Sequence, residues 1–236
     1  MVAFEYRGLG EYHADYEETW QRQRELHEAV AAGAPGRIIY VEHAPVYTAG
    51  RRTTPEQRPQ DGTPVIDVDR GGLITYHGPG QLVGYPIVRL RDGVGVVDYV
   101  RALESAVIDL LAGYGLETGR VDGRTGVWLP AGAGRPERKI CAIGVRVARR
   151  TTMHGFALNV LSSAERFGNI IPCGIADAGV TSLSRELGRD VTVAQVRPLV
   201  ERQLAEYLAW APYDPTPDYE PRPDPGKGPR VRLLTP

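Results

Sequence analysis

Residues 139–160 read KICAIGVRVARRTTMHGFALNV and contain two strand patterns in succession. Lys139–Val147 and Met153–Val160 are rich in the apolar and β-branched residues that favour strands. Other strand patterns stand on either side of this stretch, so the strands cluster in the middle of the chain. They are Val2–Leu9, Arg37–Val41, Val65–Val68, Gln81–Leu90 (where Pro86 indicates an edge or a bulge) and Gly126–Leu129.

Helical patterns lie between these strands, but strands and helices do not alternate regularly. Asp15–Ala32 carries apolar residues at helical spacing and ends at Gly33. Asp98 is expected to cap a second helix, and a third is expected from about Thr192 to Trp210, with a kink or a later start at Pro198. This order predicts an α+β fold with one domain and a mixed, largely antiparallel sheet.

The composition is that of an ordinary globular protein. The chain has 236 residues, of which 42% are hydrophobic and 24% charged, and its formal net charge is −1. This balance argues against general nucleic-acid binding, which needs a basic field. The start has no signal-peptide pattern, and no apolar run is long enough to span a membrane, so we expect no membrane association and a cytoplasmic protein.

We expect the catalytic domain to cover residues 1–211, because no linker precedes Pro212. Residues 212–236 hold eight of the 19 prolines and are expected to form an extended or disordered tail.

Lysine is rare in this chain. Of 28 basic residues only Lys139 and Lys227 are lysines, so arginine serves wherever a generic positive charge suffices. Lys227 lies in the proline-rich tail, whereas Lys139 begins a strand pattern. A lysine amine can lose its proton when it is partly buried, which arginine does not do. Lys139 is therefore a candidate functional residue.

The segment Arg70–Pro86, RGGLITYHGPGQLVGYP, is dense in glycine and contains His77. Glycines let the backbone approach a ligand closely. The plain alternative is a tight corner between two strands with a solvent-facing histidine. A second histidine, His43, lies in the segment EHAPVYTAGRR. No two histidines have the spacing of a zinc site on a helix, so we expect no metal.

Two cysteines compete as candidate nucleophiles. Cys141 lies in an apolar strand pattern, where cysteine is usually an inert small hydrophobe, but two residues from Lys139 it would share that lysine's strand face. Cys173 lies between Pro172 and Gly174, on a turn that presents a side chain. A thiol needs activation, because the thiolate is the nucleophile. Cys173 is favoured, and a purely structural role stays open for both.

Together, four segments resemble the octanoyltransferase family, the lipoyl(octanoyl) transferases of lipoate biosynthesis. They are RGGLITYHGPGQLVGYP, EHAPVYTAGRR, KICAIGVRV and NIIPCGIADAGVTSL. The resemblance extends from about Tyr16 to Leu183. It implies a fold similar to the catalytic domains of biotin and lipoate protein ligases, a cytoplasmic location, and no metal, nucleotide or other cofactor.

The resemblance also implies roles for individual residues. Cys173 matches the acyl-thioester nucleophile, Lys139 matches the lysine that lowers the pKa of that thiol, and Cys141 becomes a core residue. Tyr16 and His43 match supporting positions. The matched substrate-binding residues are Arg70, Gly71, Gly72, Leu73, Ile74, Thr75, Tyr76, His77, Ala142, Ile143, Gly144, Gly155, Phe156 and Ala157.

By this resemblance the enzyme moves an octanoyl group from octanoyl-acyl carrier protein to a lysine of lipoyl domains. The implied acceptors are the 2-oxoacid dehydrogenase acyltransferase subunits and the glycine cleavage H protein. A set of arginines is a candidate docking face for the acidic carrier: Arg51, Arg52, Arg146, Arg149 and Arg150.

Three other functions stay open as alternatives. They are an ATP-dependent lipoate or biotin ligase, a non-catalytic scaffold that binds the acyl carrier, and a thioesterase in which water is the acceptor.

Overall fold

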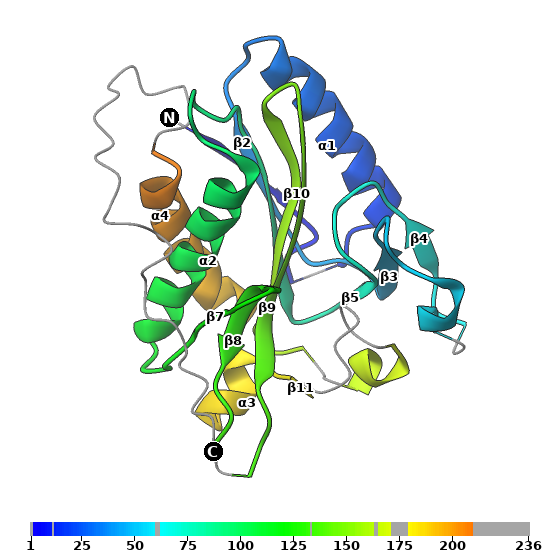
Figure 1. Cartoon of the computed structure of the whole chain (residues 1–236), viewed down its shortest axis with the longest axis vertical. Coiled ribbons are helices and arrows are strands. Elements are labelled where there is room, and N and C mark those ends of the chain that lie inside the picture. The colour runs from blue at the N-terminus through cyan, green and yellow to red at the C-terminus, as the bar shows by residue number, and fades with distance from the viewer. Residues whose placement is uncertain are drawn as a thin grey trace.

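The computed structural model describes residues 2–10, 12–59, 62–132, 134–162, 165–170 and 179–209 (Figure 1). Its main sheet has the strand order β1-β2-β6-β10-β9-β8-β7, and β11 pairs with β9. The strands of this sheet are β1 (Ala3–Arg7), β2 (Arg37–Val41), β6 (Gln81–Ile87), β7 (Gly119–Val121), β8 (Arg124–Leu129), β9 (Arg138–Ala148), β10 (Thr151–Asn159) and β11 (Gly179–Val180).

The pairing confirms the predicted mixed, largely antiparallel sheet. Only the pairs β1–β2 and β9–β11 are parallel among the described strands of the main sheet. A smaller sheet has the order β4-β3-β5, with β3 (Val46–Ala49), β4 (Val65–Asp67) and β5 (Thr75–His77). Strand β3 was not among the strands expected from the sequence, because four residues beside a proline carry little strand signal.

Helices cover both faces of the main sheet (Figure 1). On one face α1 (Tyr16–Ala31) packs against β6 and β10. On the other face α2 (Val96–Ala112) packs against α4 (Val193–Tyr207) and against β8 and β9. The short helices are η1 (Pro55–Gln57), η2 (Glu165–Asn169) and α3 (Leu183–Leu187). In the described part of the chain, no helix combines the length and apolarity that a membrane crossing requires.

Two expected details of this fold are wrong. Pro86 lies in β6, which is a central strand between β2 and β10. The sheet tolerates it because the β6–β10 backbone pairing stops at Gly84, and the Pro86 carbonyl accepts from Thr152 Oγ1 at 2.7 Å instead. The second helix begins at Val96 rather than after Asp98. The Asp98 carboxylate reaches back to accept from the Gly95 N–H at 2.8 Å, as the third residue of the helix.

The predicted domain boundary near residue 211 and the tail at 212–236 lie outside the described residues, and both stay predictions.

Candidate active site

A cavity of about 420 Å³ lies between the β9–β10 hairpin and the loop that joins β4 to β5. Most of the residues expected at the substrate site line it. The predicted residues found in the lining are Tyr16, Arg70, Gly71, Gly72, Leu73, Thr75, His77, Lys139, Ala142, Ile143, Gly144, Gly155, Phe156 and Ala157. The structure therefore brings together three parts of the chain that are far apart in the sequence: Tyr16, the segment 70–77 and the β9–β10 hairpin.

Arg70 holds the loop of residues 69–73 in place. Its guanidinium donates to the Thr48 carbonyl at 2.7 Å and to Thr48 Oγ1 at 3.0 Å, which ties the loop to β3. It also donates to the carbonyls of Gly71 at 3.0 Å and Leu73 at 2.8 Å, so the loop curls around its own side chain. A side chain at Gly144 would come within 2.9 Å of Arg70 Cδ. Arg70 thus shapes the cavity wall by fixing the backbone of the 69–73 loop against β3.

Ile74 and Tyr76 were expected at the substrate site, but they do not line the cavity. Successive side chains of a strand point to opposite faces. Thr75 and His77 therefore face the cavity, while Ile74 and Tyr76 face a separate apolar cluster that includes Phe167.

Buried aromatic rings close one side of the cavity. The Tyr16 ring stacks on His77, with centroids 5.9 Å apart, and contacts His43 at 5.1 Å. His43 lies behind this wall rather than in the lining. Its Nδ1–H donates to the Ala14 carbonyl at 3.2 Å, so its Nε2 accepts from the Tyr85 hydroxyl at 2.9 Å. His77 Nδ1–H donates to Gln81 Oε1 at 2.7 Å.

Burial keeps both histidines neutral, and this predicts how stability depends on pH. Burial lowers the pKa of His43 to about 4 and that of His77 to about 3. The unfolded chain binds these protons below about pH 6.5, whereas the folded chain does not. We expect full stability above pH 6.5 and a loss approaching about 1.4 kcal/mol per pH unit for each histidine as the pH falls towards 4. Urea unfolding at pH 7.5, 6.5, 5.5 and 4.5 measures this slope. The variant His43→Gln should have a shallower slope, and an equal slope in both proteins would contradict the argument.

Lys139 belongs to the cavity lining and is 7% exposed. Its Nζ stands 4.6 Å from the centre of the Trp128 ring, and its Cε lies close to Gly126. Gly126 has a φ of +121°, and a Cβ there would come within 2.4 Å of the Cys141 carbonyl. Only glycine fits this position beside the lysine.

A bulge separates Lys139 from Cys141. Trp128 pairs with Lys139 and Val127 pairs with Cys141, so β9 has one extra residue between the two pairs. The expectation that the lysine and the cysteine share one strand face is therefore wrong. Cys141 is fully buried in the main core, and burial raises the pKa of its thiol well above the usual range. Such a thiol is inert at neutral pH.

Cys173 lies outside the described residues, so its candidate role stays a prediction. The described residues on either side of its segment are anchored near the cavity. Ile170 packs in the cluster with Ile74 and Tyr76, and Val180 pairs with Lys139.

The lining also contains residues that were not predicted from the sequence. Among the polar ones are Arg52 (considered only for docking), Arg124 and His154. His154 had no informative spacing, because its partner Asp69 is distant in sequence and reaches it only in the fold, at 2.8 Å. In the described residues, no group of three or more His, Cys, Asp or Glu is arranged to hold a metal.

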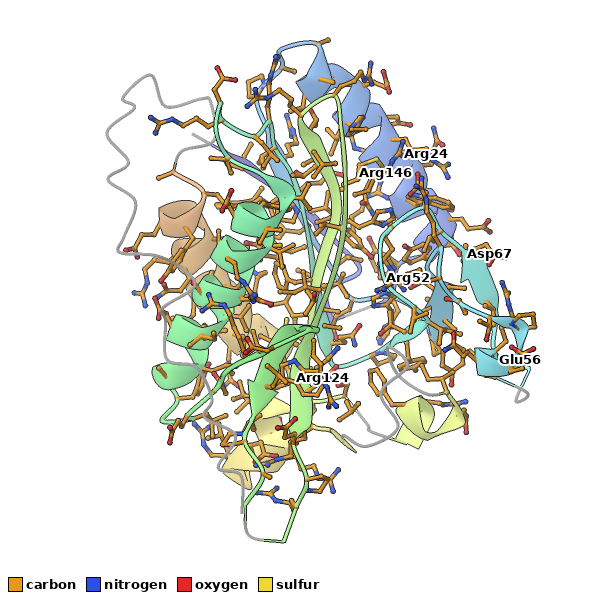
Figure 2. The ribbon with its side chains drawn as sticks, viewed as in Figure 1. Arg24, Arg52, Glu56, Asp67, Arg124 and Arg146 are labelled. Carbon is orange, nitrogen blue, oxygen red and sulfur yellow. The ribbon has the colours of Figure 1, made fainter. Side chains whose placement is uncertain are left out.

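Three of the five arginines proposed for docking form ion pairs within the chain, and the docking face stays a prediction. Arg146 pairs with Asp69, Arg149 with Glu28 and Arg150 with Asp92. In Figure 2, Arg146 lies towards α1, Arg52 lower down, and Arg124 lower still beside β8. Of the five, Arg52 lines the cavity.

Comparison with known proteins identifies the family. Residues 15–205 match the model of the lipoyl protein ligase A/B catalytic domain. The chain belongs to this family. An octanoyltransferase of Cutibacterium acnes is 56% identical over 226 residues, which is 91% of this chain and 83% of that protein. An octanoyltransferase of Mycobacterium avium is 60% identical over 182 residues, which is 77% of this chain and 78% of that protein.

Within the lipoyl protein ligase A/B family, these relatives place the chain among the octanoyltransferases, and it is an acyltransferase enzyme. Solved structures agree on the fold. The bipartite lipoate protein ligase of Thermoplasma acidophilum has a TM-score of 0.64 at 16% identity, covering 88% of this chain and 83% of that one. A lipoate-protein ligase A bound with ATP has a TM-score of 0.61 at 18% identity, covering 80% and 81%. The predicted likeness to lipoate ligases is confirmed.

Proposed function

We propose that this acyltransferase moves an octanoyl group from octanoyl-acyl carrier protein to a lysine of a lipoyl domain, through a thioester on Cys173. The high identity to proteins named octanoyltransferase carries the proposal. The cavity supports it, because an apolar slot beside a buried lysine suits an acyl thioester. The acceptors we propose are the lipoyl domains of 2-oxoacid dehydrogenase acyltransferase subunits and the glycine cleavage H protein, and the setting we propose is the cytoplasm.

The walls of the cavity offer apolar surface to an acyl chain. Val83, Ala142, Ile143 and Phe156 contribute to them, and the backbone of Gly71 and Gly144 comes close together there. Burying one CH₂ group contributes about 0.8 kcal/mol, so an eight-carbon chain brings several kcal/mol of binding free energy. The acyl chain then holds the reacting carbonyl in a fixed place.

In the first half-reaction the Cys173 thiolate attacks the carbonyl carbon of the octanoyl thioester. A new S–C bond forms, and the bond between that carbon and the carrier sulfur breaks. The Lys139 ammonium stabilises the thiolate before attack and then gives a proton to the departing carrier thiolate. The products are octanoyl-Cys173, the free carrier thiol and a neutral Lys139.

In the second half-reaction the amine of the acceptor lysine attacks the same carbon. An amide bond forms, the Cys173 sulfur leaves as a thiolate, and the neutral Lys139 amine takes the proton that the acceptor nitrogen loses. This returns both residues to their starting states. Exchange between thioesters is nearly isoenergetic, whereas formation of the amide is downhill and drives the cycle without ATP.

Intact mass spectrometry after mixing the enzyme with octanoyl-acyl carrier protein tests the proposal. We expect the wild type and Cys141→Ser to gain one octanoyl group, and Cys173→Ser to gain none. Added lipoyl domain should discharge the adduct and gain the same mass. Cys141→Ser is the matched control, since it removes the other thiol of the chain.

Three other outcomes would contradict the proposal. Transfer that requires ATP and leaves Cys173 unmodified would indicate a ligase. An adduct that water discharges as fast as the lipoyl domain does would indicate a thioesterase. Binding of the carrier without any adduct would indicate a scaffold.

A further inference from the structure

Trp128 lies beside Lys139, on the neighbouring strand of the main sheet. The two residues are directly paired between β8 and β9, so their side chains lie on the same face of the sheet. The Lys139 Nζ stands over the Trp128 ring, 4.6 Å from its centre. Trp128 is 1% exposed and is not one of the residues that line the cavity. Any influence of Trp128 on a bound substrate therefore passes through Lys139.

The Trp128 ring has little freedom to move. Its Nε1–H donates to the Arg124 carbonyl at 3.1 Å, and its side chain is among the largest that are fully buried in the described part of the chain. The Arg124 guanidinium, which Figure 2 shows beside β8, lies 6.0 Å from the centre of the same ring. Lys139 is the closer of these two cations. A ring held in this way gives the lysine ammonium a fixed surface to contact.

An aromatic ring suits both states of Lys139 in the proposed cycle. The electron-rich face of an indole attracts an ammonium, and the attraction is strongest where water is excluded. The ring carries no net charge, so it does not repel a nearby thiolate as a carboxylate in the same place would. When Lys139 is neutral, the same face packs against its aliphatic stem.

We propose that Trp128 is a positioning residue for catalysis, whose ring holds the Lys139 ammonium at the cavity and favours the pair of ammonium and thiolate on which the first half-reaction depends. This inference rests on the proposed function, because it presumes that Lys139 acts on the Cys173 thiol. Trp128 contributes through the electron density of its ring face, and that property can be changed with little change in shape.

Fluorinated tryptophans at position 128 test the inference, because each fluorine withdraws electron density from the ring face. Monofluoro-, difluoro- and trifluorotryptophan are incorporated at this position alone, and single-turnover acylation by octanoyl-acyl carrier protein is measured. We expect the maximal rate constant to fall stepwise, by about tenfold across the series, as loss of a desolvated cation–π contact should. The carrier concentration that gives half of the maximal rate should not change, because Trp128 does not line the cavity.

A second readout follows the thiolate alone. Alkylation of Cys173 by iodoacetamide at neutral pH should slow in the same order, since the thiolate is the form that reacts. A purely structural role of Trp128 would not produce a graded response to fluorine. Trp128→Phe should stay closer to the wild type than Trp128→Leu does, because phenylalanine keeps an aromatic face for the ammonium.

The chain offers a matched control at Trp20. The Arg24 guanidinium lies over the Trp20 ring, 3.8 Å from its centre, and Trp20 is not one of the residues that line the cavity. The same fluorinated residues at position 20 should therefore leave the acylation rate at the wild-type value. Thermal melts of both series measure folding separately.

Two outcomes would overturn the inference. They are a wild-type acylation rate with trifluorotryptophan at position 128, and an equal loss of rate for fluorination at positions 20 and 128. A wild type that gains no octanoyl group on Cys173 would instead contradict the proposed function.

Discussion

Replacement of Lys139 by methionine should reduce octanoyl transfer by about 10³-fold while the protein stays folded, in the range expected for loss of a general acid–base group. Methionine keeps much of the aliphatic stem that packs near Gly126 and Trp128 but removes the charge and the proton. In the proposed mechanism the amine acts in both half-reactions, so both should slow. Steady-state transfer and a thermal melt measure activity and folding separately.

A second readout isolates the charge of Lys139 from its proton transfer. If the ammonium stabilises the Cys173 thiolate, alkylation of Cys173 by iodoacetamide should require a higher pH in Lys139→Met than in the wild type. Lys139→Arg should keep the alkylation profile but transfer slowly, because arginine holds its proton. Full transfer by Lys139→Arg would contradict the proton-transfer role.

The chain offers a matched control for this experiment. Lys227 is the other lysine of the sequence, and Lys227→Met makes the same chemical change in the proline-rich segment. Its transfer rate should equal that of the wild type. A comparable loss in both variants would mean that the effect of Lys139→Met is not specific to the site.

Replacement of Glu104 by leucine should lower the free energy of unfolding by about 3–5 kcal/mol, because it leaves a buried cation without its partner. Glu104 is 1% exposed, and its Oε2 accepts from Arg120 Nε at 2.8 Å and from Arg101 at 2.7 Å. Its Oε1 accepts from the Gly126 N–H at 3.0 Å. The melting temperature should fall by about 10 °C or more, at a few degrees per kcal/mol for a chain of this size.

Two further variants test the cause of that loss. Glu28→Gln removes a carboxylate from an exposed pair with Arg149 and should leave the free energy of unfolding almost unchanged, because solvent screens such a pair. The double variant Glu104→Leu with Arg120→Met should recover part of the stability, since it removes the stranded charge as well. A Glu104→Leu protein as stable as Glu28→Gln would contradict the buried network.

The Glu104 network also connects the core to the site. The Gly126 N–H that it holds belongs to the residue beside the Lys139 stem, next to the bulge between Lys139 and Cys141. A bulge can turn one side chain to another direction from its neighbours. Because α2 fixes this bulge through Glu104, a loss of stability and a loss of lysine placement should occur together in Glu104→Leu.

Local patterns predicted the elements well. Strand β2 occupies the expected residues 37–41, and α1 covers Tyr16–Ala31 of the expected helix at Asp15–Ala32, with Asp15 as the cap that accepts from the Glu18 N–H at 3.0 Å. These features depend on neighbours within a few residues, which is the range that periodicity and capping report. The predictions for Pro86 and Asp98 were wrong because the local sequence allows two outcomes at each residue. Pro86 could lie in an edge strand or a central one, and Asp98 could cap the helix or lie in its first turn; the surrounding structure decides between them.

By itself the sequence determined the longer helices and strands of this protein, the rarity of its lysines, and the four segments that mark its family. It did not determine which side chains meet. The tertiary structure decided that Lys139 faces the cavity and Cys141 the core, that Tyr76 turns away from the site, and that Asp69 holds His154. The physical reason is that such contacts depend on strand order and on bulges across the sheet. Those are set by packing over the whole chain, whereas a local pattern reports only which face of its own element a residue occupies.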